Sequence, residues 1–176
     1  MRSDYYYLVA SLPLLDFSLS AAITYEDFLR RSREQLLDYD MAIIEQTTLA
    51  PSQDTQAARE ILRKWKEFDL TLRNELVKMR AAKKAKDSLD YIRGDYYPNP
   101  FIAHFAHLIF NQSSPLEAEK MFNRVRWDKI EELKVGHFFD IDYLVCYCLQ
   151  LQILERWKKM KQEDGEKILE KLVGQL

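Results

Sequence analysis

Apolar residues recur every seven positions through the first half of the chain, at Ala58, Trp65, Leu72 and Met79, with further apolar residues between them. Neither glycine nor proline interrupts residues 53–87, and alanine, leucine, glutamate, lysine and arginine, which favour helices, are frequent there. This spacing places the apolar side chains on one stripe of an α-helix. The pattern predicts one long helix over about residues 53–87, whose stripe packs along shorter helices or against a partner.

A second apolar segment lies near the C-terminus. Between residues 141 and 154 apolar side chains occupy almost every face of a helix, which is typical of a helix buried on all sides. Two aspartates, Asp140 and Asp142, open the segment and basic residues close it, an order that suits the helix dipole. We therefore predict a buried C-terminal helix over about 140–161, followed by a short terminal helix over 166–172.

Capping signals divide the remainder into shorter helices. Thr24 stands before an acidic first turn, and Ser114 is followed by proline and then by glutamate at the third helical position. Both are helix-start signals. The apolar opening segment, residues 5–15, is expected to be extended or short-helical chain laid against the core. Other short helices are predicted near 40–47, 101–110 and 127–134.

Composition supports a fold made of helices. The chain has 176 residues, of which 47% are hydrophobic and only 4 are glycine and 5 proline, so sheets rich in tight turns are disfavoured. We predict an all-α multi-helix bundle that forms a single domain over residues 1–176, with a candidate subdivision at the turn-rich passage near 88–100.

Charge and hydropathy limit the classes of partner. The net charge is −2 and the isoelectric point is near 6.0, so no global basic field favours nucleic acid. The longest apolar run, Tyr143–Leu149, is far shorter than the ~20 residues that span a bilayer, and the N-terminus lacks the pattern of a secretory signal. We expect a soluble, cytoplasmic protein without direct membrane insertion.

Histidines that lie near one another or near acids are potential metal ligands. His104 and His107 share a helix face, but no third ligand stands at helical spacing from them. His137 lies close in sequence to Asp140 and Asp142, yet these two acids are better explained as the N-terminal charges of the last helix. The sequence therefore assigns no metal site.

Other catalytic chemistry finds no support in the sequence. Cys146 and Cys148 lie in an apolar helix, where burial raises the pKa of a thiol and lowers its reactivity. The four glycines are too far apart for a phosphate-binding loop. We predict a protein that is not an enzyme, with no catalytic residues and no cofactor.

Two surfaces are candidates for contact with a partner. A tyrosine triplet near the N-terminus has the aromatic character of an interface, although such clusters more often belong to a core. A basic helix end suits an acidic protein partner or plain solvation better than nucleic acid. The candidate residues are Tyr5, Tyr6 and Tyr7 in the first surface and Arg80, Lys83 and Lys84 in the second.

The opening string YYYLVASLPLL at residues 5–15, followed by Glu26-Asp27-Phe28-Leu29, resembles a small bacterial family of unknown function whose genes lie in operons for V-type (A/V-type) ATPases. Three later segments also look like that family, namely Tyr39-Asp40, Leu72-Arg73-Asn74-Glu75-Leu76 and Leu149–Arg156. The resemblance covers most of the chain, and its opening string is the most specific part.

That opening is in turn loosely similar to the start of the funnel subunit of archaeal-type V-ATPases, the C-type component of the central stalk. This all-helical funnel sits on the rotor ring and receives the central shaft. The C-terminal helix predicted here is also weakly similar to the helices of that subunit, at Tyr147, Gln152, Ile153 and Arg156. The chain has about half the length expected for the funnel subunit, so a full three-part funnel is not expected. The resemblance implies a non-catalytic central-stalk or rotor component, held at the inner membrane through the rotor ring and central shaft.

Two other interpretations stay open. One is a transient assembly factor of the same complex. The other, from a different class, is a metal-dependent helical enzyme that uses His104, His107 and nearby acids.

Overall fold

The computed structural model describes residues 5–51, 59–94 and 97–173. Within these ranges it contains seven α-helices, one 3-10 helix and no strand, which confirms the all-α prediction. The elements are α1 (Tyr6–Ser11), α2 (Tyr25–Gln35), α3 (Asp38–Gln46), α4 (Glu60–Lys83), η1 (Leu89–Tyr91), α5 (Pro100–Phe110), α6 (Pro115–Lys134) and α7 (Ile141–Val173).

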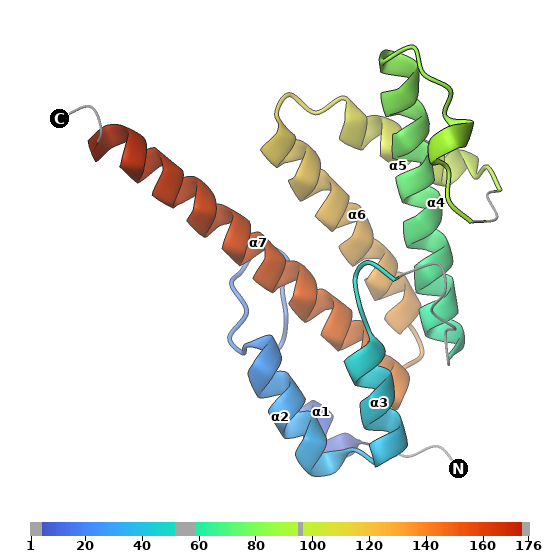
Figure 1. The fold of residues 1–176 in the computed structure, drawn as a ribbon. Coiled ribbons are helices and arrows are strands. Elements are labelled where there is room, and N and C mark those ends of the chain that lie inside the picture. The colour runs from blue at the N-terminus through green and yellow to red at the C-terminus, as the bar shows by residue number, and fades with distance from the viewer. Residues whose placement is uncertain (1–4, 52–58, 95–96, 174–176) are drawn as a thin grey trace. The chain divides into compact units, whose positions relative to one another are not determined.

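The helices form two compact units, which are described separately. Unit 1 comprises residues 1–49 and 137–176, and unit 2 comprises residues 50–136. Unit 1 thus brings α1, α2 and α3 together with α7, while unit 2 holds α4, α5 and α6 (Figure 1). The passage near 88–100 lies inside unit 2.

The N-terminal half of α7 is the core of unit 1. Its side chains from Leu144 to Ile153 are almost all fully buried, and α2 and α3 pack against it (Figure 1). The predicted buried C-terminal helix is therefore confirmed. Its predicted end near residue 161 is wrong, because α7 continues without a break to Val173. A single glycine such as Gly165 costs a helix only about 1 kcal/mol relative to alanine, and no proline follows it in the sequence.

Polar side chains of α7 hold the ends of the two helices beside it. The Glu155 carboxylate accepts a hydrogen bond from the backbone N–H of Tyr25, at 2.6 Å, at the start of α2. The Gln152 amide accepts from Leu49 N–H at 3.1 Å and donates to the Thr47 carbonyl at 2.8 Å, just after α3. The Tyr25 N–H and the Thr47 carbonyl stand at helix ends, where partners within the helix run out, so α7 fixes both elements in place.

The long helix of unit 2 is shorter than predicted. α4 begins at Glu60 and ends at Lys83, which makes it about 36 Å long at 1.5 Å per residue. Ala85 has a φ of 52°, and the N–H of Lys86 reaches the Ala81 carbonyl at 3.0 Å. This is a Schellman closure, which terminates the helix before the predicted end at 87. The predicted start at 53 lies outside the described residues.

The apolar stripe of α4 packs inside unit 2. Trp65, Leu72 and Leu76 are at most 5% exposed, and Phe68 and Met79 pack partly buried beside them. The same core includes Ala106 and Ile109 of α5 and Val125 of α6. Of the two uses that the sequence left open for the stripe, packing along shorter helices is the one observed for these residues.

α6 merges two predicted elements into one. The Ser114 hydroxyl accepts from the Glu117 N–H at 3.2 Å, which confirms the predicted helix start. The helix then runs to Lys134, so the separate helix predicted at 127–134 is wrong. The residues that connect the two predicted helices include no glycine or proline that would break a helix. Val125 and Ile130 continue the buried face of α6.

A buried ion pair joins α4 to α6 within unit 2. Arg126 and Asp69 have side chains 1% and 3% exposed, and Arg126 Nε lies 2.9 Å from Asp69 Oδ1. Arg73 Nε approaches the other carboxylate oxygen at 2.7 Å. The Arg126 guanidinium also stacks 4.1 Å from the centre of the Phe122 ring. Because two ionised side chains are removed from water here, the pair depends on all of these contacts.

Asn74 holds the chain beyond α4 against the helix. Its side-chain amide donates to the Arg93 carbonyl at 2.9 Å, and its oxygen accepts from the Arg93 N–H at 3.1 Å. The next residue, Gly94, has a φ of 65°, and a Cβ there would lie 2.9 Å from the Leu70 side chain. The chain that these two hydrogen bonds hold thus continues into a left-handed backbone conformation that favours glycine, with the Leu70 side chain close by.

We expect Asn74→Ala to lower the free energy of unfolding by about 1–3 kcal/mol, because it leaves two backbone groups of Arg93 without these partners. Urea unfolding followed by circular dichroism measures the change. Asn111→Ala is the matched control, since that asparagine is exposed and bonds to the exposed His107. Equal, small losses for both variants contradict the assignment.

Candidate functional site: an exposed aromatic edge

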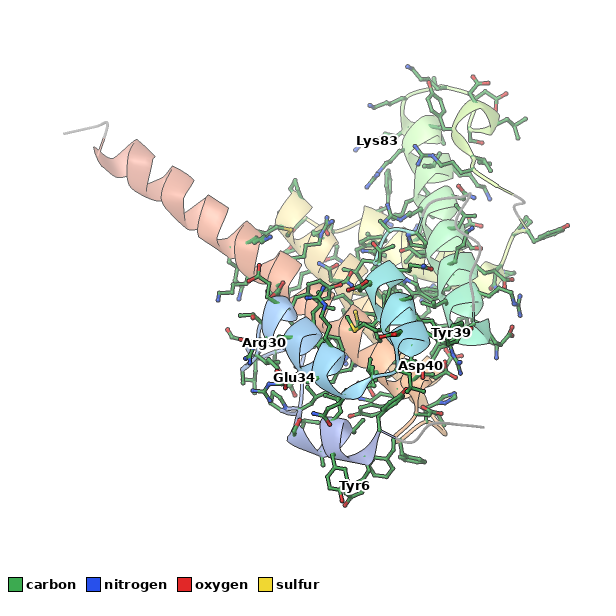
Figure 2. All side chains as sticks on the ribbon, turned by 60° about the horizontal axis from the view of Figure 1, so that its bottom comes forward. Tyr6, Arg30, Glu34, Tyr39, Asp40 and Lys83 are labelled. Atoms are coloured by element: carbon green, nitrogen blue, oxygen red, sulfur yellow. The ribbon has the colours of Figure 1, made fainter. Side chains whose placement is uncertain are left out.

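Unit 1 exposes aromatic side chains from two segments that are far apart in sequence. Tyr6 and Tyr7 of α1 are 56% and 83% exposed, and Phe138 and Phe139, just before α7, are 68% and 41% exposed. The Tyr6 ring centre lies 4.8 Å from that of Phe139 and 5.8 Å from that of Tyr7. We call these four residues the aromatic edge. Figure 2 shows the Tyr6 side chain pointing away from the helices of its unit.

Tyr5 ties the two segments of the aromatic edge together. Its backbone N–H donates to the Phe139 carbonyl at 2.6 Å, and its hydroxyl donates to the Asp40 carboxylate on α3. The side chain itself is only 8% exposed, and Leu8 on the same short helix is fully buried. The exposed rings are thus presented by backbone that is anchored to the core of unit 1.

The tyrosine triplet therefore divides between core and surface. Tyr5 belongs to the core, whereas Tyr6 and Tyr7 are accessible to a partner. Sequence reasoning missed Phe138 and Phe139 altogether. The available signal was a pair of phenylalanines beside the aspartates that open the last helix, outside its apolar stretch.

The aromatic edge has the chemistry of a protein-binding surface. Aromatic rings contribute large apolar areas at low cost in side-chain entropy, and they are enriched among the residues that dominate binding energy. Scattered apolar residues are normal on a surface, but the rings of Tyr6, Tyr7 and Phe139 lie against one another and form a patch, with Phe138 next to it in sequence. Burying these rings against a partner would release water from both faces of the contact.

The predicted basic surface lies at the end of α4 in unit 2. Arg80, Lys83 and Lys84 are all exposed, and the Lys83 ammonium lies 5.7 Å from the centre of the Phe110 ring (Figure 2). Their charge complements the C-terminal end of the helix dipole. Whether they contact a partner stays a prediction.

The structure brings three metal-ligand types together at the start of α7. His137 Nδ1 lies 2.7 Å from Asp140 Oδ2 and 3.9 Å from Asp142 Oδ2. Asp140 also accepts from the Tyr143 N–H at 3.0 Å, so it caps α7 as its charge predicted. The sequence assigned these acids to the helix start alone and did not predict their convergence with His137.

The other candidate residues have less distinctive surroundings. His104 and His107 are exposed, and no third metal-ligand type joins them among the described residues. Cys146 and Cys148 are fully buried free thiols. Burial raises the pKa of the Cys148 thiol to about 12, as expected from its apolar helix.

A shallow hollow lies between the segment before α2 and the exposed side of α7 in unit 1. It has a volume of about 240 Å³, and its lining includes Ile23, Trp157, Lys158 and Lys161. The Glu155 carboxylate at its wall holds the start of α2, as described above. Glu155, the one acidic residue in this lining, is thus used to hold the start of α2.

Residues 104–176 match the model of a family described as "Protein of unknown function (DUF2764)". The match covers less than half of the chain and contains most of α5 with all of α6 and α7. A likeness to a family of unknown function is thus shown for residues 104–176, which include only the last of the segments that carried the expected resemblance, Leu149–Arg156. The opening string lies outside the match, and the connection with V-type ATPase operons stays a prediction. Comparison with curated proteins and with solved structures found no match. In the described residues, no helix is both long and apolar enough to cross a bilayer.

Proposed function

We propose that this protein is a non-catalytic structural component of a bacterial V-type ATPase or ATP synthase, similar in role to the funnel subunit of the central stalk. It would act through packing contacts with the rotor ring or the central shaft. The observation that carries the proposal is the aromatic edge, a ring cluster exposed on anchored backbone. The identity of the partner rests on the resemblance of residues 5–15 and of the later segments to the family encoded with these ATPases.

The anchoring of the aromatic edge suits a mechanical contact. A component that transmits force must bind without a large rearrangement, because a mobile contact surface pays an entropic cost on binding. Here Tyr5 joins α1, α3 and the turn before α7 through backbone and side-chain hydrogen bonds. The surface is therefore ordered before a partner arrives. A location at the inner membrane follows from the proposal, through the ATPase and not through insertion.

The test is affinity purification of the tagged full chain from the cells that make it. We expect V-type ATPase subunits to co-purify, and the double variant Tyr6→Ser with Tyr7→Ser to recover at least about tenfold less of them, as loss of ~1.4 kcal/mol or more of interface energy predicts. The variant should keep its helix content, since exposed substitutions change stability by only about 0.5 kcal/mol.

The matched control is Tyr97→Ser, which removes a tyrosine that is 80% exposed in unit 2. This control should recover ATPase subunits at the level of the unaltered protein. Undiminished recovery with the double variant, or an equal loss with the control, would exclude the aromatic edge as the binding surface.

A further inference from the structure

The turn before α7 and the first turn of the helix together hold three potential metal ligands in a largely buried place. His137, Asp140 and Asp142 each offer one ligand atom, and these atoms all lie within 4.8 Å of one another. The side chains of Asp140 and Asp142 are each 12% exposed, and the His137 side chain is 23% exposed. Carboxylates and an imidazole that converge away from bulk water are suited to holding a cation.

We propose that His137, Asp140 and Asp142 bind a divalent transition-metal ion, with Zn²⁺ as the ion that fits best. An imidazole nitrogen is a ligand for zinc and its first-row neighbours, whereas Mg²⁺ and Ca²⁺ prefer oxygen ligands alone. One nitrogen and two carboxylate oxygens make a three-ligand set, to which water adds the fourth position of a tetrahedral site.

The distances between the ligand atoms match such a site. Bonds of about 2.0–2.1 Å in a tetrahedron place neighbouring ligand atoms about 3.3 Å apart. The His137 Nδ1 atom lies 2.7 Å from Asp140 Oδ2 and 3.9 Å from Asp142 Oδ2, so the two measured distances bracket that value. The ligand atoms of Asp140 and Asp142 lie within 4.8 Å of each other, so small side-chain adjustments would bring all three ligands to a common ion.

Asp140 is prepared for this role by its place at the helix start. Its Oδ1 atom accepts from the Tyr143 N–H at 3.0 Å, which orients the carboxylate and leaves Oδ2 facing His137. An outer hydrogen bond of this kind orients ligands in metal sites. A metal needs the lone pair of His137 Nδ1, so when it binds the imidazole keeps a single proton on Nε2 and the ring stays neutral.

Electrostatics favour a divalent cation between the two aspartates. Carboxylates held within 4.8 Å of each other repel, and a cation between them replaces that repulsion with attraction. The partial positive charge of the helix N-terminus opposes a cation there, but two full negative charges outweigh it. The ion would also fix the turn that carries Phe138 and Phe139, although the metal site does not depend on the proposed partner.

Isothermal titration of the EDTA-treated full chain with ZnCl₂ tests the proposal directly. We expect one Zn²⁺ per chain with micromolar or tighter affinity, weakened about tenfold or more by His137→Asn and by Asp142→Asn. His104→Asn is the matched control, since His104 is an exposed histidine outside the cluster, and it should bind zinc like the unaltered protein. Circular dichroism checks the fold of each variant. If His137→Asn loses helix content, Asp142→Asn decides, because it keeps the shape of the side chain.

Absence of stoichiometric zinc binding overturns the proposal, as does unchanged affinity in the folded Asp142→Asn variant. In the latter case, the zinc is bound elsewhere. Either result would mean that His137 has only a structural role, in which it contacts Asp140 and positions this aspartate to cap α7. Because titration reads metal binding itself, its failure is distinct from a failure to recover ATPase subunits.

Discussion

Asp69→Asn should lower the free energy of unfolding by roughly 3 kcal/mol or more, since it removes the carboxylate charge from a buried arginine. Arg126 is 1% exposed and cannot regain water without opening the core between α4 and α6. The substitution keeps the shape of the side chain, so the loss reports charge and not volume. Urea unfolding followed by circular dichroism measures it.

The matched control for this prediction is Asp128→Asn on α6. Asp128 forms an exposed pair with Arg124, with side chains 57% and 53% exposed. Exposed pairs contribute about 0–1 kcal/mol, so this variant should unfold almost like the unaltered protein. Equal losses of unfolding free energy for the two substitutions would mean that the Asp69–Arg126 pair is hydrated and contributes no more to stability than an exposed ion pair. A double variant, Asp69→Leu with Arg126→Met, should recover part of the loss, because no buried charge remains in it.

Leu72→Ala should cost about 2–5 kcal/mol of unfolding free energy, because it removes buried methyl groups and leaves a cavity. Leu72 is fully buried among residues of all three helices of unit 2. The same unfolding measurement applies, and Leu89→Ala is the control, since Leu89 is 74% exposed. A loss below about 0.5 kcal/mol for Leu72→Ala would show that the α4 stripe is accessible in the monomer and serves a partner.

Periodicity and capping predicted most of the helices. The seven-residue spacing of Trp65 and Leu72 identified a helix whose stripe proved to be core, and Ser114 marked the start of α6. These features are local, since they depend on residues within a turn or two of one another. Helix ends were predicted less well. Ala85 closes α4 in a conformation that glycine usually adopts, so the sequence offered no stop signal there.

The contacts that matter most for the candidate sites are long-range, and the sequence could not supply them. Asp69 and Arg126 come from different helices and form their ion pair in the core. The residues next to each of them in the sequence give no sign that the side chain is buried or paired. Tyr5, Tyr6 and Tyr7 are chemically alike, yet one is core and two are exposed, because the direction of α1 decides which ring faces the core of unit 1. His137 and its two acids were visible in sequence, but only the turn geometry joins them.

The central proposal is that this protein is a permanent, stoichiometric structural subunit of a V-type ATPase. Quantitative mass spectrometry of the intact ATPase, purified through a tag on another of its subunits, tests that claim most directly. We predict that this chain is present in a fixed, near-integer ratio to the central-shaft subunits and survives extensive washing. Its absence from the active complex would contradict the claim, and a trace found only with incomplete complexes would identify a transient assembly factor instead.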